Sequence, residues 1–188
     1  MSLLSKQTRS AYFKALGFGE YNKENLLKVQ KRYFDDPKEW DGDYGVHSDA
    51  LLRHLWNVHK YCTHFKPEEF KCKCGHCTGY PTYMKARELQ HIERIRTHFG
   101  KPMIITSALR CDYFNRKCGG LSTSFHKQGR AVDFYMAGVT DSFHNRLNSI
   151  KYIKTLPYHH YTYGNGINSL GAHVSRPGMG NALHTDTK

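Results

Sequence analysis

A histidine and an aspartate, His126 and Asp133, stand close together in the segment Ser-Phe-His-Lys-Gln-Gly-Arg-Ala-Val-Asp. Zinc accepts imidazole nitrogen and carboxylate oxygen, and a catalytic zinc site takes three protein ligands and leaves one position for water. Binding lowers the pKa of that water to about 7, which supplies a nucleophile near neutral pH. The pair therefore predicts a zinc centre that hydrolyses peptide bonds, with a third ligand elsewhere in the chain.

The residues between the two are typical of a turn that leads into a strand. Gly129 permits a tight or left-handed turn after His126, and the run from Arg130 to Tyr135 alternates as a β-strand does. Ala131 and Asp133 then share one face of the strand, where the small Ala131 leaves room beside a metal ion. A capped turn without a metal is the alternative interpretation.

Three separated motifs occur in a fixed order: Thr106-Ser107-Ala108-Leu109-Arg110, then Ser-x-His-x-x-Gly-x-Ala-x-Asp ending at Asp133, then Leu183-His184-Thr185-Asp186-Thr187-Lys188. Together they resemble the zinc D-Ala-D-Ala carboxypeptidases and peptidoglycan endopeptidases, a family whose fold is shared by the hedgehog signalling domain. The resemblance covers roughly residues 70–188 and implies a zinc-dependent peptidase.

The resemblance also implies that the zinc ligands are His126, Asp133 and a late histidine. His184 is favoured for the last place, because the family's final ligand stands in a short strand of the form aliphatic-His-x-Asp. His173 is the competing candidate. Its position in a Gly-rich, Pro-containing stretch, residues 164–180, favours a loop residue instead.

By the same resemblance, Arg110 holds a substrate carbonyl or carboxylate and stabilises the developing oxyanion, a task suited to a permanent, forked cation. A surface salt bridge is the alternative for Arg110. Ser124 is expected to orient its neighbours and the substrate by hydrogen bonding, since a metal-activated water makes a serine nucleophile unnecessary.

Several relatives place an acid or a second histidine two or three residues before the last ligand, where this chain has Asn181 and Ala182. Asp186 would share the strand face of His184, so we expect it to be the general base or the residue that fixes the histidine. The further candidates for the base are His173, His159 and His160.

Residues 1–65 are expected to form a separate helical domain. Asn22 can cap one helix and Ser48 precedes a second, each with apolar residues at helical spacing. The turn at 41–48 and the Asp49-Ala50-Leu51 that follows resemble the small three-helix peptidoglycan-binding domain. The alternative is a helical cap that packs on the catalytic domain.

Residues 66–188 are expected to form the peptidase domain, with an α+β fold: an antiparallel sheet that carries the zinc site, flanked by helices. We expect helices at 82–99 and 141–155, the latter with Phe143, Leu147, Ile150 and Ile153 facing inward. The expected strands are 103–106, 130–135, 159–163 and 183–187.

The six cysteines include Cys72, Cys74 and Cys77 in the run Lys-Cys-Lys-Cys-Gly-His-Cys. These three can be part of a structural zinc site completed by Cys62, His76, Cys111 or Cys118, or they can pair in disulfides, or stay as free thiols. Without a secretory signal the thiols should start reduced, which argues against obligatory disulfides.

The formal net charge of +12 indicates a polyanionic partner. The basic residues are scattered and no nucleic-acid-binding signature is present, so a cell wall with anionic polymers is favoured over nucleic acid. No apolar run approaches the ~20 residues of a membrane span, and the charged start of the chain is unlike a signal peptide. A phage endolysin, made in the cytoplasm and released through a separate pore or by lysis, fits these features.

The sequence thus predicts zinc-dependent hydrolysis of a peptide bond in peptidoglycan. Endopeptidase action is favoured over D,D-carboxypeptidase action, because an extra wall-binding domain suits an insoluble polymer. The alternative is a catalytically silent cell-wall-binding protein that keeps the metal site. A basic nucleic-acid binder is a third hypothesis, and it predicts steeply salt-dependent DNA affinity.

Overall fold

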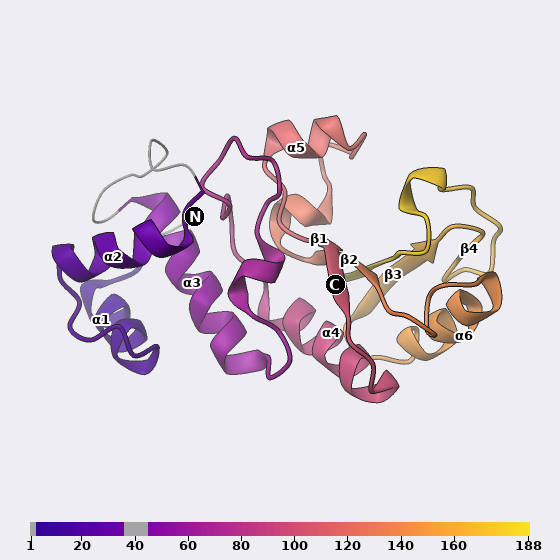
Figure 1. Cartoon of the computed structure of the whole chain (residues 1–188), viewed down its shortest axis with the longest axis horizontal. Helices are drawn as coiled ribbons and strands as arrows, with labels where there is room; N and C mark the ends of the chain where they lie inside the picture. The colour runs from indigo at the N-terminus through magenta and orange to yellow at the C-terminus, as the bar shows by residue number, and fades with distance from the viewer. Residues whose placement is uncertain (1–2, 36–44) are drawn as a thin grey trace.

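The computed structural model describes residues 3–35 and 45–188. Helices α1 (Lys6–Ala15), α2 (Lys23–Tyr33) and α3 (Val46–Tyr61) lie at one end of an elongated molecule, and a five-stranded sheet lies toward the other (Figure 1). Helix α4 (Ala86–Phe99) stands between α3 and the sheet. The α+β class expected from the sequence is confirmed.

The N-terminal helices begin at residues that cap them. The side chain of Asn22 accepts a hydrogen bond from the backbone N–H of Asn25, so α2 starts where the sequence predicts. Helix α3 starts at Val46, before Ser48, so the predicted start is wrong. The reason is tertiary: Asp49 is buried in the first turn of α3, and its carboxylate accepts from Arg9 Nε at 2.8 Å.

Much of the turn that resembles a peptidoglycan-binding domain, residues 41–44, lies outside the described residues. The boundary at residue 65 and the wall-binding role stay predictions. In the structure, α3 packs on α4, and one hydrophobic core runs from the N-terminal helices into the sheet. Leu55, Leu89 and Leu183, from α3, α4 and the last strand, are all buried members of it.

Helix α4 begins at Ala86, so the start expected at residue 82 is wrong. The backbone N–H groups just before it are used in tertiary contacts: that of Met84 donates to His54 Nδ1 and that of Lys85 to the carbonyl of Gly129. These bonds hold the segment extended until Lys85. The helix ends at Gly100, whose left-handed conformation at φ 62° closes it as expected.

The sheet is antiparallel throughout, in the order β1-β2-β5-β3-β4. The two central strands pair so that Asp133 faces His184 across the ladder, and Tyr163 pairs with His184 from the other side. The strands are β1 (Ile104–Ser107), β2 (Ala131–Tyr135), β3 (His159–Gly164), β4 (Ile167–Asn168) and β5 (Leu183–Thr187).

The strands present alternate residues to the two faces of the sheet. Thr185 bonds His91 of α4 at 2.9 Å, so this residue of β5 and its alternate neighbours face the helix. His184 and Asp186 therefore lie on the opposite face, together with Asp133 of β2. The helix covers the apolar face, and the polar residues predicted for the site gather on the other.

Helix α6 (Phe143–Ile153) contacts β3 and β4. Ile150 and Ile153 are buried as expected and Leu147 is partly buried, but Phe143 is 50% exposed, so its predicted inward position is wrong. Phe143 is the first helical residue after the Ser142 cap, and this end of the helix projects beyond the buried part. The remaining helix, α5 (Asp112–Lys117), follows β1.

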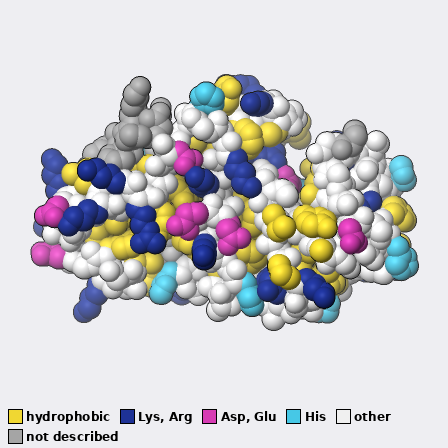
Figure 2. Space-filling model, viewed as in Figure 1, with side chains coloured by type: hydrophobic (Ala, Val, Ile, Leu, Met, Phe, Trp, Pro, Cys, Tyr) yellow, Lys and Arg dark blue, Asp and Glu magenta, His cyan; other side chains and the backbone are white. Residues whose placement is uncertain are grey.

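Lys and Arg side chains are spread over the visible face, with acidic side chains among them, instead of forming a single stripe (Figure 2). This distribution agrees with the scattered pattern of the sequence. None of the helices within the described residues is long and apolar enough to cross a membrane.

A buried neutral histidine connects the N-terminal helices to the segment before α4. His54 of α3 lies 2.9 Å from the carbonyl of Pro67 through Nε2, while its Nδ1 accepts from Met84. These two bonds fix a neutral tautomer with the proton on Nε2. Burial lowers the pKa of His54 from 6.5 to about 4.

Because the unfolded chain binds a proton at His54 below pH 6.5 and the folded chain does not, this residue should destabilise the fold as the pH falls from 6.5 toward 4. Between pH 7 and pH 5 the wild type should lose about 2 kcal/mol more than His54→Gln. Urea unfolding at both pH values measures the difference. His59→Gln, at an exposed site on the same helix, is the control and should behave as the wild type. Equal losses in the wild type and His54→Gln would contradict the assignment.

Candidate metal centre

Two imidazoles and one carboxylate converge on the open face of the sheet. Asp133 Oδ1 lies 2.7 Å from His184 Nδ1 and 3.3 Å from His126 Nε2, and the two nitrogens are 3.3 Å apart. The three residues form a group whose ligand atoms all lie within 4.8 Å of one another. The chain thus brings together the three residues that the sequence nominated as zinc ligands.

The short helix η3 (Phe125–Gln128) and the glycine after it position His126. Gly129 has φ 68°, and a Cβ at this position would lie 2.0 Å from the backbone oxygen of Tyr83. Only glycine combines this left-handed conformation with such a close approach. The turn brings the chain back into β2, so that His126 and Asp133 meet despite the residues between them.

Each histidine has one ring nitrogen engaged behind the site. His126 Nδ1 lies 2.7 Å from the carbonyl of Ala108, to which it can only donate, so Nε2 presents its lone pair toward Asp133. His184 Nε2 lies 3.0 Å from Asp186, whose carboxylate accepts a hydrogen bond from it. Partners of this kind fix the tautomer and the ring orientation of a metal-binding histidine.

The electrostatics of the group favour a bound cation. Burial opposes the charge of Asp133, yet the neighbouring His126 and His184 hold the pKa of this carboxyl far below its usual value. Burial also opposes a charge on His184, but hydrogen bonds to Asp133 and Asp186 raise its pKa to about 9. Two carboxylates thus flank a single imidazole in a largely buried site.

Arg110 adds a permanent cation beside the group. Its guanidinium donates to Asp133 Oδ2 through Nη2 and to the Ser107 hydroxyl through Nε at 2.8 Å. Oδ2 is therefore taken by arginine, and Oδ1 faces the two histidines. The ion pair is largely buried, so the surface salt bridge considered as an alternative for Arg110 does not describe it.

A cleft of about 720 Å³ opens beside Asp133 and Arg110. One wall comes from α5 and the residues after it, and the other from the segment around residues 175–182; Figure 2 shows the surface hollowed between these two parts. Asp133 is the only carboxylate among the described residues that line it. Of the three residues of the ligand group, Asp133 is the one that lines this cleft.

Two residues of the cleft were not predicted from the sequence. Tyr163 lines the cleft and stacks on the His184 ring, with a centroid distance of 4.6 Å. Burial, and then the charge of Asp133, raise the pKa of its phenol. Arg176 lies 5.3 Å from the Tyr163 ring centroid. The pairing of β3 with β5 brings Tyr163 into the cleft. No local sequence motif predicted this position.

Asp186 lies behind His184 and away from the residues that line the cleft. Its second oxygen is 2.6 Å from Nδ1 of His160, which is 44% exposed at its side chain. His159, the neighbouring candidate for the base, instead bonds Thr162 at 3.0 Å, toward the α4 side.

The last two nominated residues lie apart from the ligand group. His173 is exposed in the segment between β4 and β5, as its loop interpretation expected. Ser124 precedes η3, and its backbone bonds Leu121 and Lys127 while its side chain makes no capping bond.

A family model described as Peptidase M15 matches residues 63–165, which is more than half of the chain. The matched region includes His126, Asp133 and Arg110 and ends before β5, so His184 lies beyond it. No curated protein and no solved structure matches the chain.

Gly129→Ala should displace His126 from the ligand group. The left-handed backbone alone costs an alanine about 1–3 kcal/mol, and the overlap with Tyr83 adds to that cost. Gly138→Ala is a matched control, because Gly138 has φ 76° and a Cβ added there would meet no heavy atom within 4 Å. Gly129→Ala should unfold at a lower temperature than Gly138→Ala and should bind zinc more weakly. Thermal unfolding and zinc titration measure the two differences. Equal unfolding temperatures and equal zinc affinities of the two variants would show that the close contact between residue 129 and the backbone of Tyr83 does not constrain the turn.

Proposed function

Since the chain belongs to the peptidase M15 family, we propose that it hydrolyses a peptide bond in peptidoglycan stem peptides or cross-links, with a zinc ion held by His126, Asp133 and His184. The observation that carries the proposal is the convergence of these three side chains beside an open cleft. Two nitrogens and one oxygen form a donor set that suits catalytic zinc, and the cleft leaves room for water and substrate.

The hydrogen bonds behind the two histidines also orient the donor set for zinc, which on binding would displace the proton that His184 carries toward Asp133. The carbonyl of Ala108 and the carboxylate of Asp186 engage the outer nitrogens of the two histidines, so the inner nitrogens are the ones available to a metal. When bound, zinc supplies a water of lowered pKa and polarises the scissile carbonyl.

Arg110 is proposed to stabilise the oxyanion that develops on that carbonyl. Its Nε donates to Ser107 and its Nη2 donates to Asp133. The rest of the guanidinium group lies at the cleft. Because the anchoring bonds exist before substrate binds, little reorganisation is needed during the reaction. Tyr163, on the other side of Asp133, keeps its proton at neutral pH and can donate a second hydrogen bond to the substrate.

Asp186 is proposed to fix His184 instead of acting as the base. It is buried, it bonds His184 on the side away from Asp133, and it does not line the cleft. A general base must come within hydrogen-bonding reach of the proton that it removes. Asp186 also lies 2.6 Å from His160 Nδ1, and this second contact holds the carboxylate in position behind His184.

An endopeptidase acting on intact wall is favoured over a carboxypeptidase. Helices α1–α3 are proposed to bind the wall, which raises the local concentration of substrate without taking part in the chemistry. The net charge of +12 suits a wall that carries anionic polymers. As a lytic enzyme of the phage endolysin type, the protein would reach this substrate after release through a separate pore or by lysis.

The proposal is tested with purified peptidoglycan and defined muropeptides. The wild type, freed of metal and resupplied with zinc, should release fragments whose masses identify the bond that is cut. His126→Ala and Asp133→Asn should reduce the release to the level of a buffer blank, because each removes one of three ligands. His173→Ala, at an exposed histidine outside the group, should cleave as the wild type does.

Two results would count against the proposal. Fragment release by both ligand variants would show that the chemistry lies elsewhere in the molecule. Retained wall binding by the zinc-loaded wild type without any cleavage would favour the silent wall-binding protein.

Arg110→Lys should lower kcat by about 10²–10³-fold, because an ammonium group lacks the fork that reaches Ser107, Asp133 and the substrate together. Steady-state kinetics on a soluble muropeptide, with the zinc content measured in parallel, separates this effect from loss of metal. Arg116→Lys, at an exposed position of α5 outside the cleft lining, is the matched control. An unchanged kcat in Arg110→Lys would remove Arg110 from the oxyanion role.

A further inference from the structure

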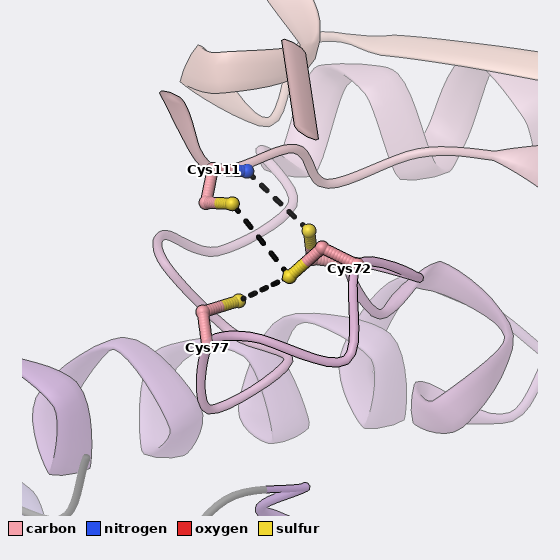
Figure 3. Close-up of side chains that lie close together, drawn as sticks. Cys72, Cys77 and Cys111 are labelled. Atoms are coloured by element: carbon pink, nitrogen blue, oxygen red, sulfur yellow. Dashed lines mark hydrogen bonds between the residues drawn. The ribbon is translucent and has the colours of Figure 1, made fainter. Parts of the chain in front are cut away.

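A second group of metal-ligating side chains lies outside the proposed active site. Cys72, Cys74 and Cys77 come from the loop between η2 (Pro67–Phe70) and α4, and Cys111 stands at the start of α5. The sulfur atoms of the four all lie within 4.8 Å of one another. Figure 3 shows Cys72, Cys77 and Cys111 pointing toward a common centre from the loop and from the segment after β1.

The spacing of the sulfurs matches a tetrahedral metal site. Cys74 Sγ lies 3.4 Å from Cys77 Sγ and 3.7 Å from Cys111 Sγ. Zn–S bonds of ~2.3 Å place the sulfurs of a tetrahedron about 3.8 Å apart. An iron–sulfur cluster separates its cysteines by an inorganic core and needs a wider ring of ligands than this one.

Each of the four sulfurs also accepts a hydrogen bond from a backbone N–H. Bonds of this kind stabilise thiolate charge and orient the ligand, as partners behind a metal site do. The donors are His76 to Cys74 at 3.2 Å, and Gly79 to Cys77, Cys111 to Cys72 and Phe114 to Cys111, each at 3.4 Å.

The loop is built to point its sulfurs inward. Gly75, between the second and third cysteines, has φ 68°, and Gly79 has φ 88°, so both adopt conformations that favour glycine. The N–H of Cys72 donates to the carbonyl of Gly79 at 2.7 Å, which closes the loop at its base. Four cysteines around one ion are a common ligand set for a structural zinc site.

The four sulfurs lie close together at buried or half-buried positions, where negative charge is costly without a counter-charge. A cation at the centre is what allows several thiolates to share so small a space.

We propose that Cys72, Cys74, Cys77 and Cys111 bind a second zinc ion, which is structural because the four thiolates fill its coordination sphere. Among the completing ligands left open by the sequence, Cys111 is thus the one selected. His76 instead packs its ring on Tyr113, and Cys62 and Cys118 lie outside the group.

The position of this site indicates which part of the fold the second zinc ion would stabilise. Cys111 follows Arg110 directly, and the N–H of Leu109 donates to the carbonyl of Phe70, just before the cysteine loop. Lys73, inside the loop, donates to the carbonyl of Ile105 at 2.9 Å. The second zinc would therefore clamp the end of β1 and the backbone that carries Arg110, which makes Cys111 a positioning residue for the cleft.

The decisive experiment removes the proposed active site and asks whether zinc remains. The full-length double variant His126→Ala/Asp133→Ala, purified and dialysed, should retain about one zinc per chain, against about two in the wild type. Its cobalt-exchanged form should show the strong near-ultraviolet thiolate-to-cobalt absorption and the visible bands of a tetrahedral site. A double variant without bound zinc, or a cobalt form without thiolate absorption, would overturn the proposal.

The cysteine variants give the reciprocal measurement. Cys74→Ser/Cys77→Ser should lose about one zinc and the thiolate absorption, and Cys118→Ser, at an exposed cysteine outside the group, should keep both. Unchanged zinc content in Cys74→Ser/Cys77→Ser would contradict the proposal. If that variant does not fold, the double variant with all cysteines intact still decides the question. Because zinc content is measured in an inactive chain, failure here is distinct from failure of the proposed peptidase activity.

Discussion

Asp133 carries a negative charge into a largely buried position at the edge of the cleft, and its surroundings are arranged around that charge. Removing a carboxylate from water costs several kcal/mol unless partners compensate for it. Arg110 binds one of its oxygens, and His126 and His184 approach the other. Removal of any one partner would leave part of the charge of Asp133 uncompensated. The positions of Arg110, His126 and His184 therefore depend on one another.

The sheet makes this arrangement possible because two constraints fix its register. Asp133 pairs with His184 across the β2–β5 ladder, and on the reverse side Thr185 bonds His91 of α4. A slip by one residue would turn His184 toward the helix and Thr185 toward the cleft, because strand side chains alternate between faces. The contact of β5 with α4 therefore helps to hold the face that carries the ligand group in register.

The sequence predicted those parts of the site that depend on local structure. The glycine turn between His126 and Asp133 and the alternation of β5 follow from nearest-neighbour rules, and so does the α+β class. The approach of Tyr163, the burial of Arg110 against Asp133 and the choice of Cys111 depend on segments far apart in the chain. No local sequence pattern predicts such contacts. Tertiary hydrogen bonds also explain why α4 begins at Ala86 and not at the predicted residue 82.

Arg110 also determines which oxygen of Asp133 faces the two histidines. Because its guanidinium takes Oδ2, Asp133 offers only Oδ1 to the group formed with the histidines. A carboxylate shared with a cation donates less charge to a metal than a free one. A metal held by such a ligand keeps more of its own charge and acidifies bound water more strongly. If zinc binds at Asp133 as proposed, Arg110 would weaken this ligation and strengthen the activation of the bound water.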